Sequence, residues 1–146
     1  KMTIGTLGGT MKGLFTPEEQ AFREEVRAFV RENLPPDVAE RLKSGSHPVP
    51  LRSDVQRWTE ILHKRGWAAY PWPKEYGGPG FTPVERYIFE DECAMAGAPE
   101  LVPFGLKMVG PVIMKYGSDH QKAYFLPRIV RLEHFWCQGY SEPGSG

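Results

Sequence analysis

Hydrophobic side chains recur at the three-to-four-residue spacing of an α-helix along most of the chain. Between Thr16 and Pro35, for example, Phe22, Val26 and Val30 fall on one helical face, and charged residues fill the other. Five helices are expected, starting near Thr16, Ser53, Thr82, Pro99 and Ser118. The pattern therefore predicts an all-α fold class.

Four of these helices are expected to begin at a capping box. In this motif a hydroxyl side chain and a Glu or Gln three residues later satisfy each other's free backbone N–H groups. The pairs are Thr16 with Glu19, Ser53 with Gln56, Thr82 with Glu85 and Ser118 with Gln121. Gly66 and Gly97 predict helix ends, as do Pro35 and Pro36, whereas Pro127 is expected to kink the last helix without ending it.

The segment from Pro99 to Tyr116 is apolar nearly all round, which predicts the central and most buried helix. Its two glycines and Pro111 favour either close packing or a bend that opens a slot for an apolar ligand. Residues 67 to 83 combine aromatic residues with Pro and Gly, as in an ordered loop held by aromatic burial. Residues 135 to 140 alternate like a strand, and a turn is expected at 141 to 144.

Composition narrows the possible functions. The 146 residues include 18 basic and 18 acidic side chains, so the net charge is zero, which disfavours nucleic acid as a partner. The longest apolar stretch, from Leu101 to Met114, contains Lys107 and is too short for a membrane span. With two cysteines and no leader-like start, the chain is expected to be cytoplasmic, with both thiols free and buried.

Spacing alone assigns no catalytic residue and no metal ligand. The four histidines lie far apart in the sequence, so a metal site is not expected. Glu90, Asp91 and Glu92 point in different directions around a helix and are interpreted as a solvated face. Ser141 lacks the glycine-flanked motif of a serine nucleophile, which leaves a turn-forming role as the simplest interpretation.

Two longer motifs resemble the acyl-CoA dehydrogenase family, flavoproteins that desaturate acyl thioesters. The motif WPKEYGGPG at 72 to 80 resembles the loop between the second and third helices of that family's amino-terminal domain. The motif YGSDHQKAYFLPRI at 116 to 129, followed by QGYSEPGSG at 138 to 146, resembles its fifth helix and the first strand of its flavin-binding β-domain. The resemblance implies a helical domain at 16 to 133 and the first strand and turn of a β-domain at 134 to 146. Residues 1 to 15 would be a flexible arm or a remnant outside the domain.

The resemblance also implies an FAD site and an acyl-CoA slot. Residues that would line the flavin are Gln138, Gly139, Tyr140 and Ser141, with Ser141 donating toward the pyrimidine ring. Candidate walls of the slot are Leu101, Phe104 and Met108, for which simple core filling is equally open. No acid of this sequence matches the family's catalytic Glu, so the isolated chain is expected to be inactive and to hold FAD weakly.

The activity implied is α,β-desaturation of an acyl-CoA thioester, with hydride transfer to flavin N5. Electrons would pass to an electron-transfer flavoprotein, and the protein would form a homo- or hetero-oligomer with other acyl-CoA dehydrogenase subunits. Two alternatives stay open at this point. One is a flavin oxidase or monooxygenase on the same scaffold, and the other is a truncated helical module without catalysis.

Overall fold

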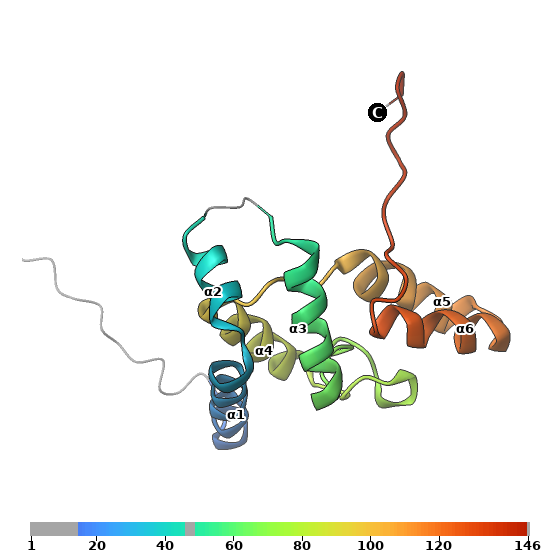
Figure 1. The fold of residues 1–146 in the computed structure, drawn as a ribbon. Coiled ribbons are helices and arrows are strands. Elements are labelled where there is room, and N and C mark those ends of the chain that lie inside the picture. Colours follow the sequence, from blue (N-terminus) through green and yellow to red (C-terminus); the bar gives the residue numbers. More distant parts are fainter. Residues whose placement is uncertain (1–14, 46–48, 146) are drawn as a thin grey trace, which may run out of the picture.

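The computed structural model describes residues 15–45 and 49–145. This part of the chain is mostly helical and contains no sheet (Figure 1). Its α-helices are α1 (Pro17–Asn33), α2 (Pro36–Lys43), α3 (Arg52–Arg65), α4 (Pro83–Ala96), α5 (Gly110–Tyr116) and α6 (Asp119–Val130). A 3₁₀ turn, η1 (Lys74–Tyr76), and a π-helix, η2 (Phe104–Val109), complete the regular structure. The all-α prediction is confirmed.

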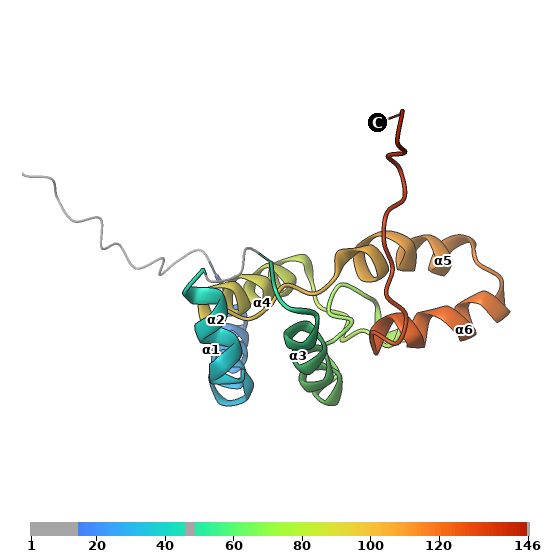
Figure 2. The ribbon, with the colours of Figure 1, turned by 45° about the horizontal axis from the view of Figure 1, so that its top comes forward.

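The helices form two groups that are connected through the segment between α4 and α5. Helices α1 and α4 pack side by side, with α2 and α3 beside them. Helices α5 and α6 form a hairpin at the other side of the molecule (Figure 2). After α6 the chain leads away from the helices in both views, as an arm without helix or strand.

Three of the predicted capping boxes are present, at the starts of α1, α4 and α6. In α1, for example, the Glu19 N–H donates to Thr16 Oγ1 over 3.2 Å, and the Thr16 N–H donates to the Glu19 carboxylate over 2.8 Å. The box predicted at Ser53 is wrong. Helix α3 begins one residue earlier, so Ser53 already lies inside the helix, and Leu51 takes the cap position without a side-chain hydrogen bond.

Helix α2 was not predicted, because Pro35 and Pro36 were interpreted only as the end of the first helix. Pro36 instead occupies the first position of a new helix, where the missing N–H costs nothing. Arg41 then ties α2 to α3, donating to Asp54 through Nε over 2.9 Å and through Nη2 over 3.3 Å. Asp54 is only 2% exposed, so this ion pair lies at the helix interface.

The most buried stretch is the connection after α3 and not the predicted fourth helix. Trp67, Ala68, Ala69, Tyr70 and Trp72 are all buried. The Trp67 ring makes edge-to-face contacts with Phe22, Phe29, Phe81 and Phe89. The expectation of a loop held by aromatic burial is therefore confirmed.

The expected continuous helix from Pro99 to Tyr116 is wrong in its start and its geometry. It begins as the π-helix η2 and becomes α-helical only at Gly110, whose N–H donates to the Gly105 carbonyl, five residues back. Gly110 therefore makes no hydrogen bond to the Leu106 carbonyl, and Pro111 has no N–H to donate to it. The Leu106 carbonyl accepts instead from Trp72 Nε1 over 2.7 Å. Glycine is required at 110, because a Cβ there would lie 2.5 Å from the Trp72 ring.

Much of this segment is exposed, since α5 is covered on one side only. Its exposed residues are Lys107, Met108, Pro111, Val112, Lys115 and Tyr116. The prediction that the segment from Pro99 to Tyr116 would be the most buried helix is wrong. The loop at residues 67 to 83, which we call the aromatic loop, fills the centre instead. Helix α6 continues through Pro127 to Val130, as predicted.

The strand predicted at 135 to 140 does not form in the described part of the chain. A strand is defined by hydrogen bonds to a neighbouring strand, and the described residues offer none. The predicted turn is present, displaced by one residue, with the Glu142 N–H donating to the Ser145 carbonyl over 2.9 Å. The assignment of residues 134 to 146 to a β-domain stays a prediction.

Candidate functional site

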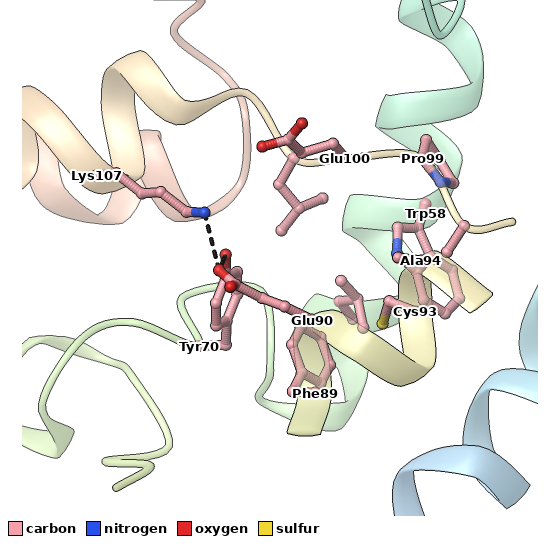
Figure 3. A pocket seen from close by; sticks show the side chains of 12 residues that line it. Trp58, Tyr70, Phe89, Glu90, Cys93, Ala94, Pro99, Glu100 and Lys107 are labelled. Carbon is pink, nitrogen blue, oxygen red and sulfur yellow. Dashed lines mark hydrogen bonds and ion pairs between the residues drawn. The ribbon is translucent and has the colours of Figure 1, made fainter. Parts of the chain in front are cut away.

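Two adjoining pockets flank the segment that joins α4 to η2. The first has a volume of about 230 Å³ and lies between α3, α4 and this segment (Figure 3). The second has a volume of about 430 Å³ and lies between the start of α3, η2 and the beginning of the arm. Glu100 and Leu101 line both pockets, which places Leu101 at their junction.

One end of the first pocket is polar. Tyr70 Oη donates to Glu90 Oε1, and Lys107 Nζ donates to the same oxygen over 2.8 Å. Figure 3 shows the three side chains converging from the aromatic loop, α4 and η2. The Lys107 ammonium also lies 5.6 Å from the centre of the Tyr70 ring. We call Tyr70, Glu90 and Lys107 the polar triad.

Electrostatics fix the charge of each member at neutral pH. Burial is the main cause that raises the pKa of Tyr70 to about 12, and the hydrogen bond to Glu90 adds to it. Partial burial acts to raise the pKa of Glu90, but hydrogen bonds from Lys107 and Tyr70 outweigh it and lower the pKa. Burial acts to lower the pKa of Lys107, but the hydrogen bond to Glu90 outweighs this effect, so the pKa is raised overall. The triad is thus an ion pair beside a neutral phenol.

The remaining walls of the first pocket are apolar and include Trp58, Leu62 and Phe89. The Cys93 thiol also lines it, and burial raises its pKa to about 12, so it is protonated and not nucleophilic at neutral pH. Both cysteines are free, as predicted, but only Cys93 is buried. Cys137 is exposed on the arm.

The raised pKa values predict alkaline destabilisation. Tyr70 has a higher pKa in the folded protein than the ordinary value of 10. Its contribution to the free energy of unfolding is therefore complete below pH 10 and is lost as the pH rises toward 12. For this buried group the loss is on the order of 2 kcal/mol. Urea unfolding at increasing pH should show this fall, and Tyr70→Phe should make it smaller, leaving the part that the buried Cys93 thiol causes. An equally steep fall in the variant would contradict the assignment to Tyr70.

The predicted slot residues occupy three different environments. Leu101 is buried between the two pockets, Phe104 is half-buried in the second, and Met108 is 45% exposed on the outer face of η2. Gln138 approaches this face, with its Nε2 3.5 Å from the Met108 sulfur. A predicted slot residue and a predicted flavin residue therefore lie together.

The other predicted flavin residues, Gly139, Tyr140 and Ser141, are exposed on the arm. Tyr140 is 85% exposed, so within the described chain it is not a core aromatic. In this part of the structure the backbone groups of 138 to 141 make no backbone hydrogen bond. They are open to an outside partner.

Comparison with known proteins identifies the chain. The family model for the acyl-CoA dehydrogenase N-terminal domain matches residues 16–133. The chain belongs to the acyl-CoA dehydrogenase family. The match covers the region predicted for the helical domain, from α1 to the residues just beyond α6.

Two of the similar curated proteins are mycobacterial acyl-CoA dehydrogenases. Acyl-CoA dehydrogenase FadE26 of Mycobacterium tuberculosis is 39% identical over 137 residues, which cover 93% of this chain and 34% of the relative. Acyl-CoA dehydrogenase IpdE1 of Mycolicibacterium smegmatis is 38% identical over 132 residues, covering 88% of this chain and 34% of the relative. The chain therefore spans about a third of the length of these relatives.

Solved acyl-CoA dehydrogenase structures share the fold. The crystal structure of the ChsE4-ChsE5 complex from Mycobacterium tuberculosis matches with a TM-score of 0.72 and 39% identity, over 90% of this chain and 32% of that one. The Tcur3481-Tcur3483 steroid ACAD matches with a TM-score of 0.73 and 36% identity, over 90% of this chain and 33% of that one.

The polar triad was missed in the sequence because its members are far apart in the chain. Glu90 was grouped with Asp91 and Glu92 as a solvated face, which is wrong for Glu92. That carboxylate is 7% exposed and accepts from Arg27 Nε and Nη2, each over 2.9 Å. Helical spacing offered a signal, since Glu92 lies beside buried Ile88 and Phe89 on the face of α4 that meets α1.

Two further observations concern the described residues of this acyl-CoA dehydrogenase domain. No three His, Cys, Asp or Glu side chains gather there in an arrangement that could hold a metal ion. None of the helices in the same residues has the length and apolar character needed to cross a membrane.

Proposed function

We propose that the chain is the amino-terminal part of an FAD-dependent acyl-CoA dehydrogenase that introduces an α,β double bond into an acyl-CoA thioester. The observation that carries this proposal is the junction at Leu101, where two pockets meet beside the open arm. A slot for an acyl chain and a surface for a flavin would then adjoin each other, as desaturation requires.

The arm fits one edge of a flavin. The backbone N–H groups of 138 to 141 are unpaired in the described chain, and a Cβ on Gly139 would meet no atom within 4 Å. An approaching ring could thus accept hydrogen bonds from the backbone at close range. When bound, FAD supplies the hydride acceptor. Ser141 would donate its hydroxyl to the pyrimidine side and stabilise the negative charge that arrives there.

Two of the predicted slot residues, Leu101 and Phe104, would hold the acyl chain in a dry environment. Phe104 and Leu101 present apolar side chains to the second pocket, together with Val55 and Phe135. Met108 would lie nearest the flavin edge, because Gln138 contacts its sulfur. Excluding water from the second pocket would favour removal of the α-proton by a base that we expect to lie outside this chain.

The similar proteins suggest a substrate and partners. One solved relative is a steroid ACAD and another is a two-component complex, ChsE4-ChsE5. We therefore extend the proposal to a bulky, ring-containing acyl-CoA and to a hetero-oligomer with a second acyl-CoA dehydrogenase subunit. An electron-transfer flavoprotein would accept the electrons. Two free thiols favour the cytoplasm.

The test is anaerobic reduction of the complete enzyme, purified with its co-purifying subunits. Adding a ring-containing acyl-CoA should bleach the visible flavin absorbance and yield an enoyl-CoA that is two hydrogens lighter. Stoichiometric oxygen consumption under air would instead indicate an oxidase. A complete protein without flavin, and without desaturation, would overturn the proposal in favour of a non-catalytic module.

Ser141→Ala in the complete enzyme should weaken the stabilisation of the reduced flavin by about 1 to 3 kcal/mol, because one hydroxyl donor to a charged group is lost. The midpoint potential of the flavin and the rate of its reduction by acyl-CoA should both fall. Thermal stability should change little, since Ser141 is exposed. Unchanged potential and rate with a large loss of stability would show that Ser141 serves only the turn.

A further inference from the structure

We infer that the polar triad at the end of the first pocket binds a neutral oxygen substituent, a keto or hydroxyl group, at the far end of the acyl group. The inference rests on the proposed function and adds the substrate class of the slot. Tyr70, Glu90 and Lys107 would then determine specificity without taking part in the desaturation.

The position of the two pockets on either side of Leu101 supports this placement. Phe135, at the start of the arm, and Phe104 line the second pocket, whereas the triad lines the first. Glu100 and Leu101 form the wall that the two pockets share. An acyl group that lies along Phe104 with its reacting carbons near the arm would therefore bring its far end to this wall, beside the pocket that the triad lines.

The size of the first pocket limits what it can receive. Its volume of about 230 Å³ lies below the roughly 300 to 1,000 Å³ typical of sites that enclose a whole ligand. It therefore suits one end of a larger molecule. Trp58, Leu62 and Phe89 present broad apolar surfaces to this space, which suits a ring better than a polar chain.

The hydrogen-bonding capacity of the triad specifies the oxygen. An ammonium carries three donors, and Lys107 uses one on Glu90 Oε1, so donors are left for an acceptor in the pocket. Glu90 Oε2 accepts no hydrogen bond in the described structure and could accept from a hydroxyl. Side chains of the triad are partly exposed, with Lys107 at 38% and Glu90 at 49%, so a ligand can reach them.

The charge of the pocket argues against an anionic substituent. Its charged side chains are two carboxylates, Glu90 and Glu100, and one ammonium, Lys107 (Figure 3). A carboxylate on the ligand would add a third negative charge beside Glu90 and Glu100. A pure hydrocarbon end would remove water from the ion pair without offering a hydrogen bond in its place. A neutral oxygen avoids both costs.

The experiment compares two acyl-CoA thioesters with the same ring skeleton, one carrying a keto group on the distal ring and one without it. The complete enzyme should show a higher kcat/KM for the keto compound. Lys107→Met should reduce that preference by about 10-fold to 100-fold, the range for a hydrogen bond to a charged group. Lys64→Met serves as the matched control, because Lys64 is an exposed lysine of α3 outside the pocket.

Binding provides a second measurement that does not depend on turnover. Calorimetry with CoA thioethers of the same two ring skeletons should give the same preference in Kd and the same loss in Lys107→Met. If that variant does not fold, Lys107→Gln removes the charge while keeping a polar end. Replacing the keto group by a hydroxyl in the thioether pair adds Glu90→Gln as a probe, which should weaken the hydroxyl compound more than the keto compound.

The outcomes separate the two proposals. Equal kcat/KM and equal Kd for the two ring compounds in the unmodified enzyme would overturn the inference and leave the desaturase function intact. An equal loss for both compounds in Lys107→Met would also overturn it. If neither thioester is desaturated and neither thioether binds, the proposed function fails and the inference falls with it.

Discussion

Trp72→Ala is expected to lower the free energy of unfolding by about 3 to 5 kcal/mol, the range for removing a large buried aromatic side chain. Trp72 is 1% exposed and fills the space between the aromatic loop and the π-helix. Its indole N–H is also the donor found for the Leu106 carbonyl, which the helix itself leaves unpaired. The substitution thus creates a cavity and an unsatisfied buried carbonyl together.

Trp72→Phe separates these two effects. Phenylalanine keeps most of the ring but cannot donate to Leu106, so the loss should be smaller, about 1 to 3 kcal/mol. Urea unfolding followed by circular dichroism gives both values. If Trp72→Phe is as stable as the unmodified protein, then the hydrogen bond to the π-helix contributes nothing and our explanation of that helix is wrong.

Local signals in the sequence predicted the parts of the fold that depend on local chemistry. The boxes at Thr16, Thr82 and Ser118 are correct because a cap and its partner lie only three residues apart. The π-helix could not be predicted in this way. It depends on Trp72, which lies 34 positions before Leu106 and meets it only in the folded chain.

The candidate site shows the same division. Leu101 and Phe104 were predicted through a family resemblance, and the structure places both at the pockets. The polar triad was not predicted, because Tyr70 lies in a loop and the partners on α4 and η2 are 20 and 37 positions away. A carboxylate in a helix has the same sequence signature whether it meets water or a lysine from elsewhere in the chain.

The ion pair between α1 and α4 is expected to be the second large contributor to stability. Glu92 is 8% exposed at its side chain and accepts two hydrogen bonds from the Arg27 guanidinium. Arg23, with a side chain only 14% exposed, lies 3.5 Å from the same carboxylate. Removing the carboxylate would leave this buried cation with Asp91 as its remaining ion-pair partner, 3.3 Å away in the described structure.

Glu92→Ala should therefore lower the free energy of unfolding by about 3 kcal/mol, the lower end of the range for breaking a buried ion pair, because half-exposed Arg27 can regain water. The matched control for Glu92→Ala is Glu24→Ala, which removes the other carboxylate bound to Arg27. Glu24 is 56% exposed, and an exposed ion pair contributes about 1 kcal/mol at most to the free energy of unfolding. Urea unfolding at low and high salt should show a small, salt-dependent loss for Glu24→Ala. For Glu92→Ala it should show a large loss with little salt dependence. Equal losses in the two variants would mean that water solvates Glu92 as well as Glu24, contrary to its buried position between α1 and α4.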